Sequence, residues 1–276
     1  MTGPDPGSIP ELLRIRPGAA VDLRALDPDS TPGTDGDKEA GRARLKELRK
    51  ELADFQRRFW AEKKRSLLIV LQALDAGGKD GAIRKVFTAF NPQGTVVTGF
   101  GVPTEEELAH DYLWRVHART PGTGRIGIFN RSHYEDVLVV RVRKLVPESV
   151  WRPRYEQINA FERTLAASGT VILKFFLHMS PDEQKARFEK RLENPDKRWK
   201  FSLRDLDVRK QWDEYRAAYE EALSRCSTDE APWFAIPADH KWYRDLALAE
   251  IVAETGRRLD PQYPPPDEDL SGVVIA

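Results

Sequence analysis

Short runs of apolar residues recur along the chain and alternate with longer stretches in which apolar residues step by three and four. The run from Leu67 to Leu74 is broken only by Gln72 and is flanked by polar residues, which is typical of a parallel strand buried on both faces. Further runs predict strands at Thr95–Phe100, Arg125–Asn130, Thr170–His178 and Trp233–Pro237. The pattern therefore predicts five strands in all.

Helical periodicity fills the segments between these runs. From Asp37 to about Lys64 the apolar residues form one stripe, which comprises Leu45, Leu48, Leu52, Phe55 and Phe59. Further helices are expected at residues 104–119, 137–143, 147–167, 181–193, 204–225 and 242–259. Because strands that alternate with helices form parallel sheets covered on both faces, the pattern predicts an α/β fold with a five-stranded parallel sheet between two helical layers.

The two ends of the chain differ from the body in composition. Residues 1–37 are rich in proline, glycine and aspartate, which predicts an extended arm that packs on the body or on a partner. The proline-rich residues 263–276 predict an extended tail. The segment between them, residues 38–262, is expected to be one domain.

A glycine turn joins the first strand to the helix that follows it. Its residues are Asp75, Ala76, Gly77, Gly78, Lys79, Asp80 and Gly81. Unpaired N–H groups at the start of the helix, and glycines that let a ligand approach the backbone, predict an anion site. The alternative is a tight strand-to-helix turn with a solvated lysine.

The match of this turn to the phosphate-loop (Walker A) pattern is partial. Ala73 stands at the first glycine position, and Asp80 replaces the Ser or Thr that normally holds Mg²⁺. A carboxylate must then take over that role. Asp75 is the candidate metal ligand inside the loop.

A second polar segment follows the third predicted strand. In an open parallel sheet, ligands bind at the carboxyl ends of the strands, so Asp75 and the pair Asn130-Arg131 are expected to meet at one site. Asn130 stands where the Walker B pattern usually has an aspartate, and Arg131 is expected to face phosphates. Ser132 and Glu135 have the spacing of a helix-capping box, so Glu135 is interpreted either as a cap or as a ligand that reaches the metal, with Asp136 as a further candidate. His178 ends the fourth strand.

A basic loop separates two helices that are themselves rich in arginine and lysine. It runs from Asn194 to Ser202 and carries Lys197, Arg198 and Lys200. Such a hairpin, over about residues 185–215, is interpreted as a helical lid whose cations stabilise charge on a transferred phosphoryl group. The alternative is a solvated charged helix pair. Trp199 and Phe201 favour a loop that is partly sheltered from solvent.

Composition narrows the classes of partner. The 276 residues include 44 basic and 44 acidic side chains, so the net charge is zero and favours neither nucleic acid nor a membrane surface. The single cysteine, Cys226, cannot form an intramolecular disulfide. The five histidines lack the spacing of a zinc site. With no signal-like start and no membrane-length apolar run, the protein is expected to be soluble and cytoplasmic.

Taken together, the motifs resemble the polyphosphate kinase 2 family. They are DAGGKDG at 75–81, NPQG at 91–94, FNRSHYEDVLVVRV at 129–142, NPDKRWKFS at 194–202 and STDEAPWFAIPADHKW at 227–242. The resemblance covers roughly residues 45–260. It implies a P-loop kinase-like fold with a helical lid, and transfer of the terminal phosphoryl group of inorganic polyphosphate to AMP or ADP with Mg²⁺. The FNRS form of the second motif resembles the subfamily that accepts both nucleoside mono- and diphosphates.

The resemblance also implies roles for particular residues. Asp75 and Glu135 are implied to hold the metal or orient the acceptor phosphate, and Lys79 and Arg131 to bind phosphates at the transfer point. The residues implied to bind substrate or phosphate are Ala76, Gly77, Gly78, Asp80, Gly81, Arg84, Lys85, Asn91, Asn130, Lys197, Arg198 and Lys200. Family membership further implies a homo-oligomer, a dimer or a tetramer.

Two other functions compete with this interpretation. An ATP-dependent nucleoside monophosphate kinase has the same fold but normally keeps the Ser or Thr that Asp80 replaces here. A non-enzymatic phosphate-loop module that binds nucleotide or nucleic acid has no need of a basic lid, and its binding to oligonucleotides would depend steeply on salt.

Overall fold

The structure is a computed structural model that describes residues 5–271, 273 and 275. Its centre is a five-stranded sheet with the order β2-β3-β1-β4-β5 and all neighbours parallel. The strands are β1 (Ser66–Gln72), β2 (Thr95–Gly99), β3 (Ile126–Asn130), β4 (Thr170–His178) and β5 (Trp233–Pro237). The predicted α/β fold with a five-stranded parallel sheet is confirmed.

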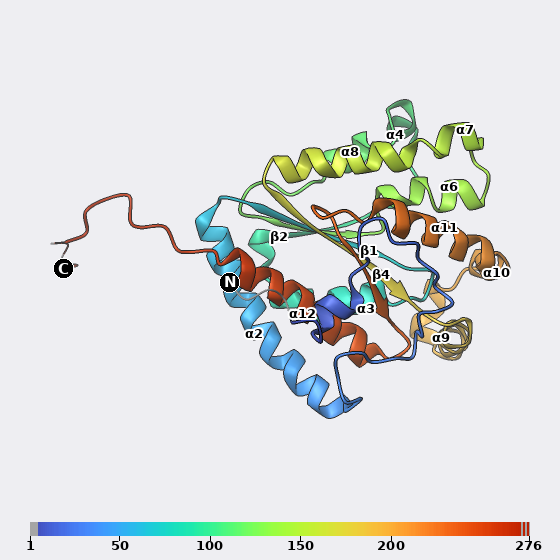
Figure 1. The fold of residues 1–276 in the computed structure, drawn as a ribbon, viewed down its shortest axis with the longest axis horizontal. Helices are drawn as coiled ribbons and strands as arrows, with labels where there is room; N and C mark the ends of the chain where they lie inside the picture. The colour runs from blue at the N-terminus through green and yellow to red at the C-terminus, as the bar shows by residue number, and fades with distance from the viewer. Residues whose placement is uncertain (1–4, 272, 274, 276) are drawn as a thin grey trace.

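Helices cover both faces of this sheet. Figure 1 shows α8 (Arg154–Ala167) and α11 (Trp212–Cys226) on one side, and α2 (Lys38–Glu62) and α12 (Lys241–Leu259) on the other. The remaining helices are α1 (Ile9–Leu13), α3 (Lys79–Lys85), α4 (Glu105–Ala109), α5 (Trp114–His117), α6 (Val139–Val142), α7 (Glu148–Trp151), α9 (Pro181–Glu193) and α10 (Leu203–Lys210). The described residues also form the short 3-10 helices η1 (Phe87–Ala89), η2 (Pro92–Gly94), η3 (His133–Asp136) and η4 (Pro195–Lys200).

The central strand β1 divides the core in two. Leu67, Ile69 and Leu71 belong to the cluster that contains the stripe of α2 and the inner face of α12. Leu68 and Val70 belong to the opposite cluster, together with residues of α8 and α11. Because successive side chains of a strand point to opposite faces, an unbroken apolar run is what a doubly covered strand requires.

Three of the expected helices are broken into shorter pieces. The segment 147–167 divides into α7 and α8 around Pro153, which lacks the N–H that a continuous helix needs. The segment 104–119 divides into α4 and α5, and between them Asp111 accepts a hydrogen bond from the N–H of Leu113 at 2.9 Å. The segment 204–225 divides into α10 and α11 at Gln211. The segment 137–143 retains only α6, which is preceded by η3.

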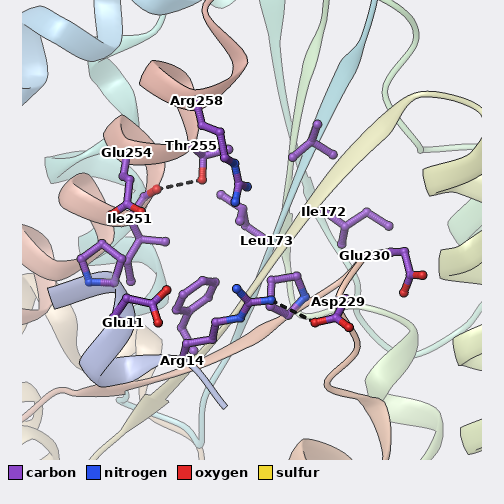
Figure 2. A pocket seen from close by; sticks show the side chains of 14 residues that line it. Glu11, Arg14, Ile172, Leu173, Asp229, Glu230, Ile251, Glu254, Thr255 and Arg258 are labelled. Carbon is purple, nitrogen blue, oxygen red and sulfur yellow. Dashed lines mark hydrogen bonds and ion pairs between the residues drawn. The ribbon is translucent and has the colours of Figure 1, made fainter. Parts of the chain in front are cut away.

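The amino-terminal arm lies along the edge of the sheet at β5. In this arm, the N–H of Ile15 donates to the carbonyl of Trp233 at 2.8 Å, and α1 buries Ile9 and Leu13 in the core. A cavity of about 70 Å³ lies beside α1. Figure 2 shows residues that line it, among them Arg14, Asp229 and residues in the last turns of α12. Within residues 5–37 the arm contains α1 and is otherwise without helix or strand.

The carboxyl-terminal tail runs away from the body after α12 (Figure 1), and its described residues from 263 onward form no helix or strand. Over the described residues, none of the helices combines the length and the apolar composition that crossing a membrane requires.

Candidate active site

The turn after β1 has the backbone geometry of an anion-binding loop. Ala76 and Gly78 lie in the left-handed region, with φ of 64° and 99°, and α3 begins directly afterwards at Lys79. A Cβ atom at Gly77 would come within 2.5 Å of the Cβ of Ala73. The turn therefore needs glycine at 77 for space and at 78 for conformation.

Lys79 is buried under this turn. Its Nζ donates to the carbonyl of Ala73 at 2.7 Å, and only 8% of the residue is exposed. Burial and the neighbouring Arg131 guanidinium lower the pKa of Lys79 to about 8, although Asp75, Glu135 and Asp80 act in the opposite direction. Because burial removes most of the water around this ammonium group, a bound anion would stabilise its charge. The alternative of a solvated lysine is wrong.

Arg131 connects the two polar segments. Its Nη2 donates to Asp75 Oδ1 at 2.6 Å, and its Nη1 lies 4.0 Å from Glu135 Oε2. Asn130, one residue earlier, donates from Nδ2 to Asp80 Oδ1 at 2.9 Å. The carboxyl ends of β1 and β3 therefore meet, as neighbouring parallel strands must.

Glu135 is a site residue and does not cap a helix. The Ser132 hydroxyl accepts from the N–H of Tyr134, while the Gln72 amide, with its NH₂ turned to the carboxylate, donates to Glu135 Oε1 at 3.0 Å. Burial raises the pKa of Glu135 despite the nearby cations Arg131 and Lys79. The capping-box interpretation of Ser132 and Glu135 is therefore wrong.

Two cavities meet at Asp75 and Arg131. The larger, about 920 Å³, lies between the phosphate loop, the end of β2 and the lid. The expected site residues that line it are Asp75, Ala76, Gly77, Gly78, Lys79, Asp80, Gly81, Arg84, Asn130, Arg131 and Lys197. The smaller, about 310 Å³, is lined by Glu135 and by aromatic and aliphatic side chains that include Phe100, Tyr215 and Tyr219.

Several expected site residues lie outside the lining of both cavities. Asn91 caps η2 by accepting from the N–H of Gln93 at 2.9 Å, and the carbonyl of Lys85 accepts from Arg49. Arg198 donates from Nε to the carbonyl of Leu192 at 2.7 Å. The side chain of Lys200 lies outside the described part of the chain.

Two further expectations concern His178 and Asp136. The His178 Nε2 shares a hydrogen bond with the carbonyl of Leu26 in the amino-terminal arm, at 2.8 Å, so this residue is engaged away from the cavities. Asp136 lines the smaller cavity, but its Oδ1 accepts from Arg154 Nη1 at 3.0 Å. The cations beside Asp136 are Arg154 and Arg115, whereas Arg131 and Lys79 lie beside Glu135, which makes Glu135 the better candidate for a metal ligand.

The segment interpreted as a lid comprises α9, η4 and α10. Phe201 packs edge-on against Phe188 of α9, with 5.6 Å between the ring centroids, which anchors the end of η4. Trp199 is 77% exposed, so of the two aromatic residues Phe201 alone shelters the loop from solvent. The exposed aromatic side chain leaves η4 with less packing than the helices of the body.

The sequence analysis did not identify the side chains of α9 and α12 that contact the loop. Gln184 and Arg187 of α9 donate to the carbonyls of Asp75 and Ala76 at 2.9 and 3.0 Å. Arg244 of α12 lies against Gly78, where a Cβ atom would collide with its guanidinium. The glycine pair signalled a close approach, but the sequence carried no sign of which side chain makes it.

The donor set fits Mg²⁺ only in part. Within residues 5–271, 273 and 275, no three His, Cys, Asp or Glu side chains cluster so that they hold a metal by themselves. Asp75 and Glu135 supply two carboxylates beside Lys79 and Arg131. Mg²⁺ at phosphoryl-transfer sites takes one or two carboxylates and completes its octahedron with water and substrate phosphates, so this pair fits the ion when phosphate is bound.

The arrangement suits phosphoryl transfer. Such reactions need cations placed on the non-bridging oxygens and two substrates aligned on one phosphorus atom, and little other chemistry from the protein. Lys79 and Arg131 provide the cations; both line the larger cavity, and Arg131 lines the smaller one as well.

Comparisons with known proteins agree with this geometry. A family model described as polyphosphate kinase 2 matches residues 35–262. The chain is 52% identical over 262 residues to a protein of Meiothermus ruber named AMP/ADP-polyphosphate phosphotransferase, covering 95% of this chain and 98% of that one. It is 43% identical over 264 residues to an ADP-polyphosphate phosphotransferase of Rhodopseudomonas palustris, covering 91% of each. The crystal structure of polyphosphate kinase 2 from Arthrobacter aurescens matches with a TM-score of 0.92 at 41% identity, covering 96% of this chain and 94% of that one. This chain therefore belongs to the polyphosphate kinase 2 family.

Proposed function

We propose that the protein is a polyphosphate-dependent nucleotide kinase that transfers the terminal phosphoryl group of inorganic polyphosphate to AMP and ADP. The observation that carries the proposal is the meeting of Lys79, Arg131, Asp75 and Glu135 at the carboxyl ends of β1 and β3. The name of the Meiothermus ruber relative, which is similar over nearly the whole length, supports the two acceptors.

The two cavities suggest how the substrates are arranged. Polyphosphate is a repeated anion without a base, so the larger cavity with the phosphate loop, Arg84 and Lys197 suits the donor. The aromatic walls of the smaller cavity suit a nucleoside, whose flat base packs on Tyr215 and Phe100. Tyr215→Ala is then expected to raise KM for AMP and leave KM for polyphosphate unchanged; the reverse pattern exchanges the two cavities.

Within this reaction the chain's own groups have separate tasks. Lys79 and Arg131 attract the non-bridging oxygens of the transferred group, and Asp75 holds the Arg131 guanidinium in place. Mg²⁺, held by Asp75 and Glu135 together with phosphate oxygens, would neutralise further charge on the transferred group. The attacking atom is a phosphate oxygen that is already anionic near neutral pH, so a strong general base is not needed.

The activity is tested by a coupled luminescence assay with long-chain polyphosphate, Mg²⁺ and either AMP or ADP. We expect ATP from both acceptors with no nucleoside triphosphate added. ATP from ADP alone would keep the family activity but remove the second acceptor. ADP formed only from AMP plus ATP would establish the alternative, an ATP-dependent nucleoside monophosphate kinase.

We further propose that the protein works as a homo-oligomer, a dimer or a tetramer, in the cytoplasm. The edge strand β2 leaves Val96 and Val97 about half exposed, at 52% and 50%, on opposite faces of the strand. The one cysteine, Cys226, is buried and free, which is consistent with a reducing compartment. Light scattering after size-exclusion chromatography tests the oligomer, and a monomer at micromolar concentration refutes it.

A further inference from the structure

The segment that carries Arg131 and Glu135 has a second face turned to the interior. Arg131 and Glu135 line the cavities, whereas His133 and Tyr134 between them are fully buried, each with 0% exposed. The tight 3-10 turn of η3 produces this alternation, because consecutive residues of such a helix point about a third of a turn apart. The position of the site residues therefore depends on what holds His133 and Tyr134.

A buried carboxylate holds both of them. Oε1 of Glu162, on α8, accepts from the Tyr134 hydroxyl at 2.9 Å and lies 3.1 Å from His133 Nε2. Its Oε2 pairs with Lys174 Nζ, on β4, at 2.5 Å. The same ammonium donates to the Tyr134 hydroxyl at 2.8 Å and to the carbonyl of Cys226 at 2.5 Å. Side chains or backbone of α8, β4 and the last residue of α11 thus meet next to η3.

This network leaves little freedom to its members. Lys174 uses all three of its N–H donors, and both oxygens of Glu162 are engaged. Burial alone would raise the pKa of Glu162, but Lys174 and His133 outweigh it and the pKa lies below its ordinary value. A buried ion pair that is fully hydrogen-bonded contributes little net stability, yet its hydrogen bonds admit one geometry, because any displacement leaves a buried donor or acceptor without a partner.

The backbone next to this network is strained. Arg131 has a φ of 65°, in the left-handed region that non-glycine residues rarely adopt. Its N–H donates to the carbonyl of Leu71 at 3.0 Å, which holds one side of the residue. His133 and Tyr134 hold the other side through Glu162. Strain of this kind persists only where the surroundings impose it.

We propose that Glu162 is a positioning residue, with Lys174 as its counter-ion: its carboxylate oxygen holds η3 through His133 and Tyr134, so that Arg131 and Glu135 stay at the point of phosphoryl transfer. The inference rests on the proposed function of that site. It assigns a task to a charged pair that lies inside the core, touches neither cavity and adds little to stability by itself.

The test compares two double variants that both remove the buried charges. Glu162→Gln with Lys174→Met keeps an oxygen that accepts from Tyr134 and His133. Glu162→Leu with Lys174→Met removes that acceptor as well. We expect the Gln/Met protein to keep kcat within about 3-fold of wild type, and the Leu/Met protein to lose about 10-fold or more, which is 1.36 kcal/mol or more of activation free energy. KM for both substrates should stay within about 2-fold.

Ser66→Ala is the matched control for a loss that is only structural. The Ser66 hydroxyl is hydrogen-bonded to that of Thr170 at 2.9 Å. This buried pair lies at the amino-terminal ends of β1 and β4, whereas the site lies at the carboxyl ends of β1 and β3. We expect Ser66→Ala to lower the melting temperature and leave kcat unchanged. Equal kcat in the two double variants, or a fall in kcat for Ser66→Ala of the same size, overturns the proposal. If the Leu/Met protein does not fold, Tyr134→Phe serves in its place, since it removes only the shared hydroxyl.

A crystal structure of the less active variant separates this inference from the proposed function, because it needs no turnover. Displacement of the Arg131 guanidinium from Asp75 supports the positioning role even if polyphosphate proves not to be the donor. An Arg131–Asp75 pair still at 2.6 Å, with φ of Arg131 unchanged, refutes it whatever the substrate is.

Discussion

The buried charge of Lys79 is expected to serve phosphoryl transfer and to lower the stability of the folded protein. The pKa of Lys79 falls from 10.5 to about 8 because the group is buried next to Arg131. At about 1.36 kcal/mol for each pH unit, the protonated lysine destabilises the folded protein by about 3 kcal/mol at neutral pH. Lys79→Met keeps the apolar stem and removes the charge, but it also loses the hydrogen bond from the charged ammonium to Ala73, worth about 2 kcal/mol. We therefore expect the variant to be more stable by about 1 kcal/mol.

The sign of the pH dependence follows from the same numbers. Between pH 8 and 10.5 the unfolded chain holds the proton of Lys79 and the folded protein does not, so the stability of the wild type rises with pH across this window. The advantage of Lys79→Met should be complete below pH 8 and should disappear as the pH approaches 10.5.

Urea denaturation of the substrate-free proteins at pH 7 and at pH 10 measures both effects. Lys197→Met is the matched control, because it removes an exposed lysine and should change stability little. The turnover of Lys79→Met should fall by about 10²-fold or more, since a cation at the transferred phosphate is lost. A variant no more stable than the wild type at pH 7, or an advantage that does not change with pH, refutes the reasoning.

Three further predictions concern the phosphate loop and its partner. Asp75→Asn should lose most turnover while its circular dichroism and melting temperature match the wild type; near wild-type rates remove Asp75 from the site. Arg131→Ala should lower kcat by about 10²-fold or more, and a mild effect means that the phosphates bind elsewhere. Gly78→Ala should be destabilised by roughly 1 kcal/mol or more in thermal denaturation, because its φ is 99° and the added methyl group meets Arg244. A neutral Gly78→Ala would show that the loop adopts another conformation.

Local patterns account for the elements of this fold that were predicted. The apolar run ending at Leu74 and the DAGGKDG turn need only the alternation of a strand and the chemistry of glycine, both of which operate over a few residues. The helices that were predicted too long failed where a local signal was present, at Pro153 and Asp111, but competed with a longer periodic pattern.

Only part of the candidate site could be predicted from local sequence patterns. The convergence of Asp75 with Arg131 was predictable, because parallel strands bring their carboxyl ends to one edge. Whether Glu135 caps a helix or enters the site was not, because the same spacing serves both, and its partner Gln72 lies on a strand distant in the sequence.

The apolar and glycine patterns were enough to predict the parallel sheet, the strand–turn–helix at residues 67–87, the family and the residue types available for phosphoryl transfer. The packing of the folded chain was needed to show that Lys79 is buried, that Gln184, Arg187 and Arg244 contact the loop, and that Asn91 and Arg198 have other partners. The physical reason is that turns and strands are set by interactions between neighbours in the chain. The burial of a charge, and the partner it finds, depend on which distant helices pack beside it.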